Sequence, residues 1–263
     1  MIFSKDTVIQ LIYNKRVCIV GPANYLNKQN IGKEIDSYDT VVRFNKGHNL
    51  IKDPDIFGSR TDILYHCVSQ DPDNGGEITK EIAKKIPIVF AYPLLTRNDN
   101  SSFANGNSCE YEKIKDFVPR TNIVKKDIYM EWEKDIGCRP NTGIIAILDI
   151  LNMKPKELYI TGFTLFKDGY SKLYRNQIDN TYVTEQNSKY KVLDRMFNAG
   201  YKGAHDQYLI YLYLKKHILN KKNIKLDDIL IEILNFDANK YSRENSLQHL
   251  SDREQFIHFL YYD

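Results

Sequence analysis

The chain has 263 residues, of which 42% are hydrophobic and 27% charged, and its formal net charge is +3. These values are ordinary for a soluble globular protein with a sizeable core, arranged as one large α/β domain or two small ones. A charge of +3 gives no support for nucleic-acid binding, which needs a dense basic face, but it is compatible with a small anionic ligand.

The cysteines and the N-terminal segment predict the compartment. The four cysteines lie far apart and form no CxxC pair, which argues against a zinc site or a disulfide scaffold and favours a reducing compartment. Charges at Lys5 and Asp6 interrupt the first apolar stretch, and no run of about 18 apolar residues follows. We therefore expect a cytoplasmic protein without signal peptide or membrane span, with at most peripheral membrane contact.

Strand-like apolar runs alternate with segments of helical spacing along the chain. The runs are Val17–Val20, Thr40–Arg43, Ile63–Tyr65, Ile88–Ala91, Glu157–Thr161 and, more weakly, Asn223–Leu226. The helical segments are Ile78–Ile86, Glu110–Val118, Thr142–Met153 and Asp206–Leu219. This alternation predicts an α/β fold, a single Rossmann-like domain whose mostly parallel sheet is flanked by helices. Ligands of such folds bind outside the carboxyl ends of the strands.

Two polar segments, Ser69–Glu77 and Thr96–Ser108, are rich in Asn, Asp, Ser and Gly and predict loops or a lid. The residues from 221 to 263 are charged and amphipathic. They predict a C-terminal strand and helical extension packed on the same domain as residues 1–220.

Gly21 ends the first apolar run and opens the segment "GPANY", which includes Asn24. A glycine at this place lets the backbone approach a phosphate or a ribose closely. Taken alone, a tight turn between a strand and a helix explains it equally. The GxGxxG fingerprint of dinucleotide binding is absent.

The segment Pro140-Asn141-Thr142-Gly143 precedes the apolar stretch "IIAILDIL". Asn141 or Thr142 can cap a helix whose first N–H groups suit a phosphate, and a plain cap without ligand is the alternative. Gly143 favours a ligand, because a glycine inside the first turn costs about 1 kcal/mol against alanine.

His205 stands before a helical segment in "KGAHDQYLIYLYLKKH", with Asp206 as the expected N-cap. Histidine is the side chain best suited to accept a proton near neutral pH. A surface histidine beside a capping aspartate explains the segment equally well. The two Asp-Pro-Asp segments, at residues 53–55 and 71–73, fit proline-containing turns, so we expect no metal site.

Together these segments resemble the sialyltransferases of glycosyltransferase family 29 over Val17 to about Leu226. "GKEIDSYDTVVRFNKG" and "FGSRTDILYH" match the family's long motif. "RPNTGIIAILDILNMKPKELYITGF" matches its short motif, except that Thr161 replaces a tyrosine. The very short motif places a catalytic histidine ahead of a helix, and this position falls on His205.

The resemblance implies a sialyltransferase-type variant of the GT-A fold, in which residues 1–220 form a CMP-sugar-binding glycosyltransferase domain. It implies inverting transfer of sialic acid from CMP-sialic acid to a glycan hydroxyl, with no metal and no cofactor. His205 is the general base by this resemblance. The expected donor-binding residues are Gly21, Asn24, Asn45, Asn141, Thr142, Gly143, Gly162 and Phe163.

The chain also departs from the family pattern. Pro22 and Tyr25 replace two asparagines of the glycine turn, where Asn24 is the expected substitute for one, and Ile210 replaces a glutamate. The motif disulfide is absent, since its positions hold Val17 and Pro155.

The block upstream of His205 that assists the phosphate in the family contains no histidine, so Tyr170, Tyr174 or Arg175 is the expected substitute. The absent disulfide and anchor predict a soluble microbial or viral relative. Two alternatives remain open: a transferase for another CMP-activated acidic sugar of the CMP-Kdo type, and an inactive relative that binds nucleotide or glycan. The acceptor, the linkage and the oligomeric state are not readable from the motifs.

Overall fold

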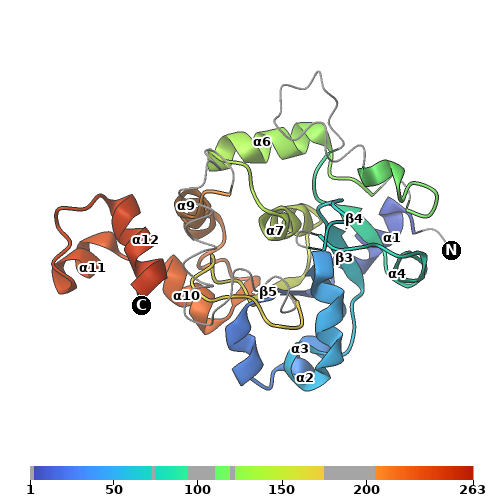
Figure 1. Ribbon diagram of the computed structural model, residues 1–263, viewed down its shortest axis with the longest axis horizontal. Coiled ribbons are helices and arrows are strands. Elements are labelled where there is room, and N and C mark those ends of the chain that lie inside the picture. The colour runs from blue at the N-terminus through green and yellow to red at the C-terminus, as the bar shows by residue number, and fades with distance from the viewer. Residues whose placement is uncertain (1–2, 73–74, 94–109, 119–121, 175–204, 263) are drawn as a thin grey trace.

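A computed structural model describes residues 3–72, 75–93, 110–118, 122–174 and 205–262 (Figure 1). These residues form one six-stranded parallel sheet with the strand order β4-β3-β2-β1-β5-β6. The strands are β1 (Arg16–Val20), β2 (Thr40–Phe44), β3 (Ile63–His66), β4 (Ile88–Phe90), β5 (Glu157–Thr161) and β6 (Ile224–Leu226). The predicted α/β fold with a parallel sheet is confirmed.

Helices connect the strands and cover both faces of the sheet (Figure 1). The α-helices are α1 (Lys5–Ile12), α2 (Gly32–Asp36), α3 (Pro54–Phe57), α4 (Lys80–Lys85), α6 (Lys126–Ile136), α7 (Thr142–Asn152), α9 (Gln207–His217), α10 (Asp228–Leu234), α11 (Ala238–Glu244) and α12 (Asp252–Tyr262). Two 3₁₀ helices, η1 (Asn24–Lys28) and η2 (Asn45–Lys52), follow β1 and β2.

The sheet is buried on both faces, which explains why its strands are continuous apolar runs. In β1, Val17 and Ile19 join one core with α7, α9 and α10, whereas Cys18 and Val20 join a second core with η1, α2 and α3. Figure 1 shows the first set of helices on one side of the sheet and α2 and α3 on the other.

The chain order reverses between β1 and β5. From β1 the chain adds β2, β3 and β4 in one direction, and then returns to place β5 against the free edge of β1. Val20 and Thr161 are register partners at the carboxyl ends of these two strands. Loops that leave such a switch point on opposite sides open a crevice for ligands in α/β folds.

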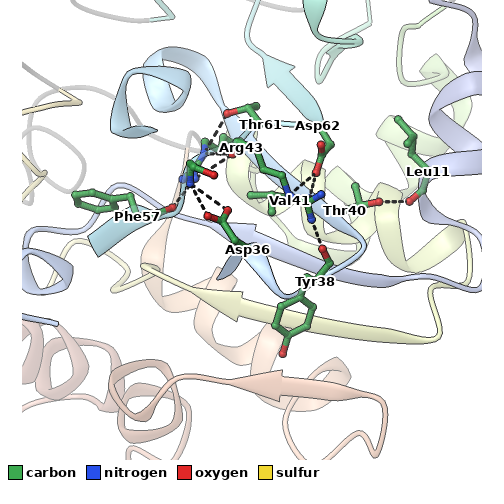
Figure 2. A network of polar contacts seen from close by, with 11 residues as sticks. Leu11, Asp36, Tyr38, Thr40, Val41, Arg43, Phe57, Thr61 and Asp62 are labelled. Carbon is green, nitrogen blue, oxygen red and sulfur yellow. Dashed lines mark hydrogen bonds and ion pairs between the residues drawn. The ribbon is translucent and has the colours of Figure 1, made fainter. Parts of the chain in front are cut away.

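The segment "GSRT" after α3 is fastened to β2 by a buried arginine (Figure 2). Arg43 is fully buried and donates hydrogen bonds to the carbonyl oxygens of Phe57 and Arg60 and to the hydroxyl of Thr61. The carboxylate of Asp36 accepts the backbone N–H of the next serine, Ser59, at 2.8 Å. This part of the long motif therefore acts as a brace inside the fold.

Residues after 220 share the sheet and the core with the residues before them. β6 pairs with β5, and Phe256 of α12 stacks on Tyr211 of α9 with 4.3 Å between ring centroids. In Figure 1 the C-terminal helices α11 and α12 lie at the opposite end of the molecule from the N-terminus. The domain boundary at residue 220 stays a prediction.

Most predicted elements lie within two residues of the observed ones, but some points differ or fall outside the described residues. Helices α1, α2, α3 and α6 were not predicted, and of the predicted helix Glu110–Val118 only residues 110–112 are helical before the chain turns. The predicted lid Thr96–Ser108 lies outside the described residues, as does Arg175. No helix among the described residues combines the length and the apolar character that crossing a membrane requires.

Candidate functional site

Two glycines cross at the carboxyl ends of β1 and β5. The N–H of Gly21 donates to the carbonyl oxygen of Thr161 at 2.7 Å. A Cβ atom on Gly21 would lie 2.0 Å from the carbonyl oxygen of Gly162, and one on Gly162 would lie 2.5 Å from that of Gly21. Gly162 also has a φ of +77°, which side chains disfavour. Each turn thus requires glycine because of the other, with or without a ligand.

The Gly162 turn is held by two residues that are distant in sequence. Its N–H donates to the carboxylate of Asp227 at 2.8 Å and to the hydroxyl oxygen of Tyr25 at 3.0 Å. The Tyr25 hydroxyl in turn donates to the Asp227 carboxylate. Burial, followed by the charge of Asp227, raises the pKa of Tyr25, so the phenol keeps its proton. Asp227 was not predicted, although an aspartate before the apolar "DILIEIL" is an N-cap signal.

Asn24 begins η1, and its side chain bonds within this helix. Its backbone N–H donates to the carbonyl oxygen of Gly169 at 2.7 Å, and its Oδ1 accepts from Asn27 Nδ2 at 2.7 Å. The side chain is thus oriented by a neighbour three residues on. Its donor-binding role stays a prediction.

Asn45 stands directly after β2, in left-handed backbone with a φ of 52°, which asparagine tolerates better than most residues. Its Oδ1 accepts the N–H of Cys67 at 3.0 Å, which ties the ends of β2 and β3 together. Its Nδ2 lies 3.5 Å from the hydroxyl of Tyr174. The ammonium of Lys46 lies 5.9 Å from the Tyr174 ring centroid, and Tyr170 packs on the same ring. Amide, cation and phenol groups therefore gather at the end of β2.

The structure decides which residue caps α7. Asn141 is the N-cap, and its side chain accepts the N–H of Ile144 at 3.1 Å. Thr142 is the first helical residue and is buried. A Cβ atom on Gly143 would lie 2.7 Å from the ring of Phe163, so this ring accounts for the glycine without a ligand.

Phe163 connects three of the predicted positions. Its ring lies over Gly143 and meets Phe44 edge-on, with 5.2 Å between ring centroids. Phe44 ends β2 and precedes Asn45. The ends of β2 and β5 and the start of α7 therefore meet around one aromatic ring.

His205 is joined to the segment before α7 by Arg139. The backbone N–H and the Nδ1 of His205 lie 2.8 and 3.0 Å from the carbonyl oxygen of Arg139. A carbonyl only accepts, so Nδ1 carries the proton and Nε2 keeps its lone pair. The Nη2 of Arg139 lies 3.4 Å from this Nε2. Arg139 was not predicted, although it is the cation directly before "PNTG".

Arg139 is itself oriented by Tyr92. Its guanidinium lies 5.1 Å from the centroid of the Tyr92 ring, and the Tyr92 hydroxyl donates to the carbonyl oxygen of Pro140 at 3.0 Å. The ring therefore supports both the cation and the turn that leads into α7.

The surroundings keep His205 neutral. Burial, followed by the positive charge of Arg139, lowers its pKa from 6.5 to about 4. Desolvation and a nearby cation both disfavour the imidazolium, and only the bond to the Arg139 carbonyl opposes them. At neutral pH the ring is thus an unprotonated acceptor at Nε2.

Asp206 is the N-cap of α9, as predicted. Its Oδ1 accepts the N–H groups of Tyr208 and Leu209, both at 3.1 Å. Its other oxygen pairs with Arg253 of α12 at 2.5 Å. Ile210, where the family has a glutamate, is fully buried in the apolar core.

With the exception of Asn24, the predicted site residues are linked by contacts at the carboxyl ends of β1, β2 and β5 and at the start of α7. The links run from His205 through Arg139 to the start of α7, then through Phe163 to the crossing of Gly162 and Gly21. Asn45 is linked to Phe163 through its neighbour Phe44, whose ring contacts the Phe163 ring. Within the described part of the chain, no three His, Cys, Asp or Glu residues gather in a group that could hold a metal ion.

Comparison with known proteins gives one family and several relatives. The sequence model of glycosyltransferase family 29 (sialyltransferase) matches residues 11–99. A chicken (Gallus gallus) CMP-N-acetylneuraminate-beta-galactosamide-alpha-2,3-sialyltransferase 1 is 24% identical over 169 residues, which cover 59% of this chain and 46% of that protein.

Two solved structures are also similar. A mammalian sialyltransferase in complex with Gal-beta-1-3GalNAc-ortho-nitrophenol is 20% identical with a TM-score of 0.37, over 63% of this chain and 59% of that chain. A second structure of a mammalian sialyltransferase is 20% identical with a TM-score of 0.35, over 57% and 54%. The chain thus matches about half the length of these relatives.

Proposed function

We propose that this chain, a relative of the sialyltransferases of glycosyltransferase family 29 whose family signature lies in residues 11–99, is an enzyme. It transfers sialic acid from CMP-sialic acid to a glycan hydroxyl. The contact between His205 and Arg139 beside the start of α7 carries this proposal. It joins an unprotonated imidazole, a cation and the N-terminus of a helix at the sheet edge where α/β folds bind ligands.

His205 is the general base in this mechanism. Its Nε2, which faces Arg139 in the free protein, takes the proton of the acceptor hydroxyl once the guanidinium has turned to the donor phosphate, as the acceptor oxygen bonds to the anomeric carbon of the sugar. The bond from that carbon to the phosphate oxygen of CMP breaks at the same time, and the electron pair leaves with CMP. Attack opposite the leaving group inverts the anomeric configuration. The transition state resembles an oxocarbenium ion, so holding the two reactants in line supplies much of the rate.

The start of α7 and Arg139 stabilise the charge that develops on the departing phosphate. The N–H groups of the first turn carry partial positive charge, and guanidinium is a strong phosphate partner. An anion next to Arg139 also offsets the charge that lowers the pKa of His205. Donor binding therefore raises the basicity of the imidazole when a base is needed.

Asn45, with Lys46 and the Tyr170–Tyr174 pair, forms the nucleotide side of the site. An amide can bond a base or a ribose, and a lysine and phenols suit a phosphate. A leaving group with a single phosphate carries less charge than a diphosphate. The proposal therefore includes no metal ion and no cofactor.

Two alternatives keep the fold and change the activity. Pro22 and Tyr25 in the glycine turn favour another CMP-activated acidic sugar of the CMP-Kdo type. The same two residues together with the apolar Ile210 favour an inactive relative that binds nucleotide or glycan. The neutral His205 at the start of α9 favours the enzyme over the inactive relative.

The test is release of CMP from a panel of CMP-sugars, with and without a lactose-type acceptor, each with and without EDTA. We expect acceptor-dependent CMP release from CMP-sialic acid that EDTA does not change. Turnover only with CMP-Kdo would establish the first alternative, and tight CMP binding without any release would establish the second. Loss of turnover in EDTA, restored by a divalent cation, would contradict the metal-free mechanism.

A further inference from the structure

Asp227 joins the C-terminal segment to the switch point of the sheet. It follows β6, its own N–H bonds the carbonyl oxygen of Ile160 at 3.2 Å, and its Oδ1 caps α10 by accepting the N–H of Leu230 at 2.8 Å. The second oxygen is not needed for the cap. It accepts the N–H of Gly162 at 2.8 Å and the hydroxyl of Tyr25.

We propose that Asp227 and Tyr25 are positioning residues for the donor, a role that rests on the proposed function. They hold the Gly162 turn against Gly21, so that backbone at the switch point stays open to the phosphate and ribose of a CMP-sugar. Neither side chain needs to touch the donor.

The geometry of Gly162 gives the reason. Its backbone is left-handed and lies in van der Waals contact with Gly21, so the turn has little freedom to move without losing that packing. Its N–H points to the Asp227 carboxylate, and a bond to an ionised acceptor is stronger than one between neutral groups. Without this acceptor the N–H would be left partly buried with only the phenol oxygen of Tyr25.

A shift of Gly162 is transmitted to the rest of the site. The next residue, Phe163, packs on Gly143 at the start of α7 and on Phe44 before Asn45. The Gly162 turn thus sets the distance between the nucleotide side of the site and the helix terminus that meets the phosphate.

This placement also explains a departure from the family. Tyr25 stands where the resemblance expects an asparagine of the glycine turn, and its hydroxyl is used on Asp227 and Gly162. The C-terminal segment and the altered glycine turn are therefore linked by a hydrogen bond between residues 202 positions apart along the chain.

Matched variants of the full chain separate positioning from stability. Asp227→Asn keeps an oxygen for the α10 cap but turns an NH₂ group toward the N–H of Gly162. Tyr25→Phe removes one oxygen atom and keeps the ring. The controls are Asp237→Asn, at the N-cap of α11, and Tyr241→Phe, whose hydroxyl bonds His258 at 2.9 Å.

Each protein is titrated with CMP by calorimetry, and KM and kcat are measured for CMP-sialic acid and for the acceptor. We expect the Kd for CMP to rise about 10-fold or more in Asp227→Asn and about 3-fold or more in Tyr25→Phe. The KM for the donor rises together with the Kd for CMP, while the KM for the acceptor stays near its wild-type value. In both control variants all of these values stay near wild type. Lys225→Gln, within β6 but outside this contact, adds a further control for the segment.

The outcomes are distinct. A wild-type protein that does not bind CMP would defeat the proposed function and this inference together. Wild-type binding with Asp227→Asn and Tyr25→Phe indistinguishable from their controls would overturn the inference alone. If Asp227→Asn does not fold, Tyr25→Phe decides, because loss of a single hydroxyl leaves the core packing of the ring in place.

Discussion

The carbonyl oxygen of Arg139 receives both the backbone N–H and the Nδ1–H of His205, and the guanidinium of the same arginine returns to the other ring nitrogen. This contact fixes the tautomer of the imidazole, leaves Nε2 as the proton acceptor and places a positive charge beside it. The backbone of His205 is left-handed, with a φ of 57°, and Asp206 caps the helix that follows. The ring is therefore held from both sides in one orientation.

Burial of His205, together with the charge of Arg139, sets the pH dependence of activity. The base is active when neutral, so kcat/KM falls as the pH drops through the pKa of His205 in the free enzyme, at about 4. Arg139→Gln removes one of the two causes of the lowered pKa, and the acidic limb should move upward toward 6.5. The residue after His205, Asp206, and its ion-pair partner Arg253 are unchanged in this variant.

The measurement is a pH profile of kcat/KM together with NMR titration of the His205 ring. Arg16→Gln is the control, because Arg16 begins β1 at the other end of the sheet, where it pairs with Glu157. If neither the acidic limb of the kcat/KM profile nor the titration of the His205 ring shifts in Arg139→Gln, the guanidinium does not act on His205.

Asn45 is expected to hold the nucleotide. Asn45→Ala removes an amide from the end of β2, and the Kd for CMP should rise about 5- to 10-fold in calorimetry. Asn239→Ala, at an exposed position of α11, is the matched control. Unchanged CMP affinity in Asn45→Ala would remove this residue from the site and leave it a structural role through Cys67 and Tyr174.

Arg43 is expected to matter for stability and not for chemistry. It is fully buried, and burial lowers its pKa to about 10, so it stays charged at neutral pH. Arg43→Lys keeps the charge but cannot reach the oxygens of Phe57, Arg60 and Thr61 together. The free energy of unfolding in urea should fall by about 2–4 kcal/mol.

The same urea series carries its own control. Lys33→Gln changes a charged residue of α2 on the surface, and it should leave the unfolding free energy within about 0.5 kcal/mol of wild type. An Arg43→Lys protein as stable as wild type would mean that the brace shown in Figure 2 contributes little to folding.

His66 makes the fold sensitive to acid. Its Nδ1 accepts the N–H of Val68 at 3.0 Å and its Nε2 lies 3.1 Å from the carbonyl oxygen of Gly76, a pattern that fits the neutral ring. Burial lowers its pKa from 6.5 to about 4. Between these values the unfolded chain binds a proton that the folded chain does not, so stability falls as the pH falls from 6.5 to 4.

The loss from His66 amounts to about 3 kcal/mol once the pH reaches its folded pKa. His66→Gln keeps a donor for the Gly76 carbonyl and does not titrate, so its unfolding free energy should depend less steeply on pH in this window. The unfolding free energy of both proteins is measured in urea at pH 7 and pH 5. An equal change with pH in wild type and His66→Gln would contradict the lowered pKa of His66.

The sheet could be predicted from sequence because its strands are buried on both faces. Continuous apolar runs such as Glu157–Thr161 then stand out between polar segments, and this strand matches the structure at both ends. Helix α6 was missed because "KDIYMEWEKDI" is mostly charged. Its buried residues, Tyr129, Trp132 and Ile136, do recur at the three- and four-residue spacing of an amphipathic helix.

The ends of the strands gave the expected positions of Gly21 and Asn45, because parallel strands end at a common edge, whereas Gly162 was expected from the resemblance to the family's short motif. The partners of these residues could not be read in the same way. Arg139 and Asp227 act through contacts that span 66 and 202 positions of the chain, and no local pattern encodes such pairings. Gly143 has a second explanation in the structure, because the packed ring of Phe163 requires a glycine there whether or not a ligand binds, and its donor-binding role stays a prediction.

The most direct test of the account compares His205→Ala with His217→Ala, which lies at the other end of α9 with its ring stacked on Tyr213. Transfer from CMP-sialic acid and CMP affinity are measured for both variants. We expect His205→Ala to lose about 100-fold or more in kcat while its Kd for CMP stays near wild type, and His217→Ala to keep both values. Wild-type turnover in His205→Ala would contradict this expectation.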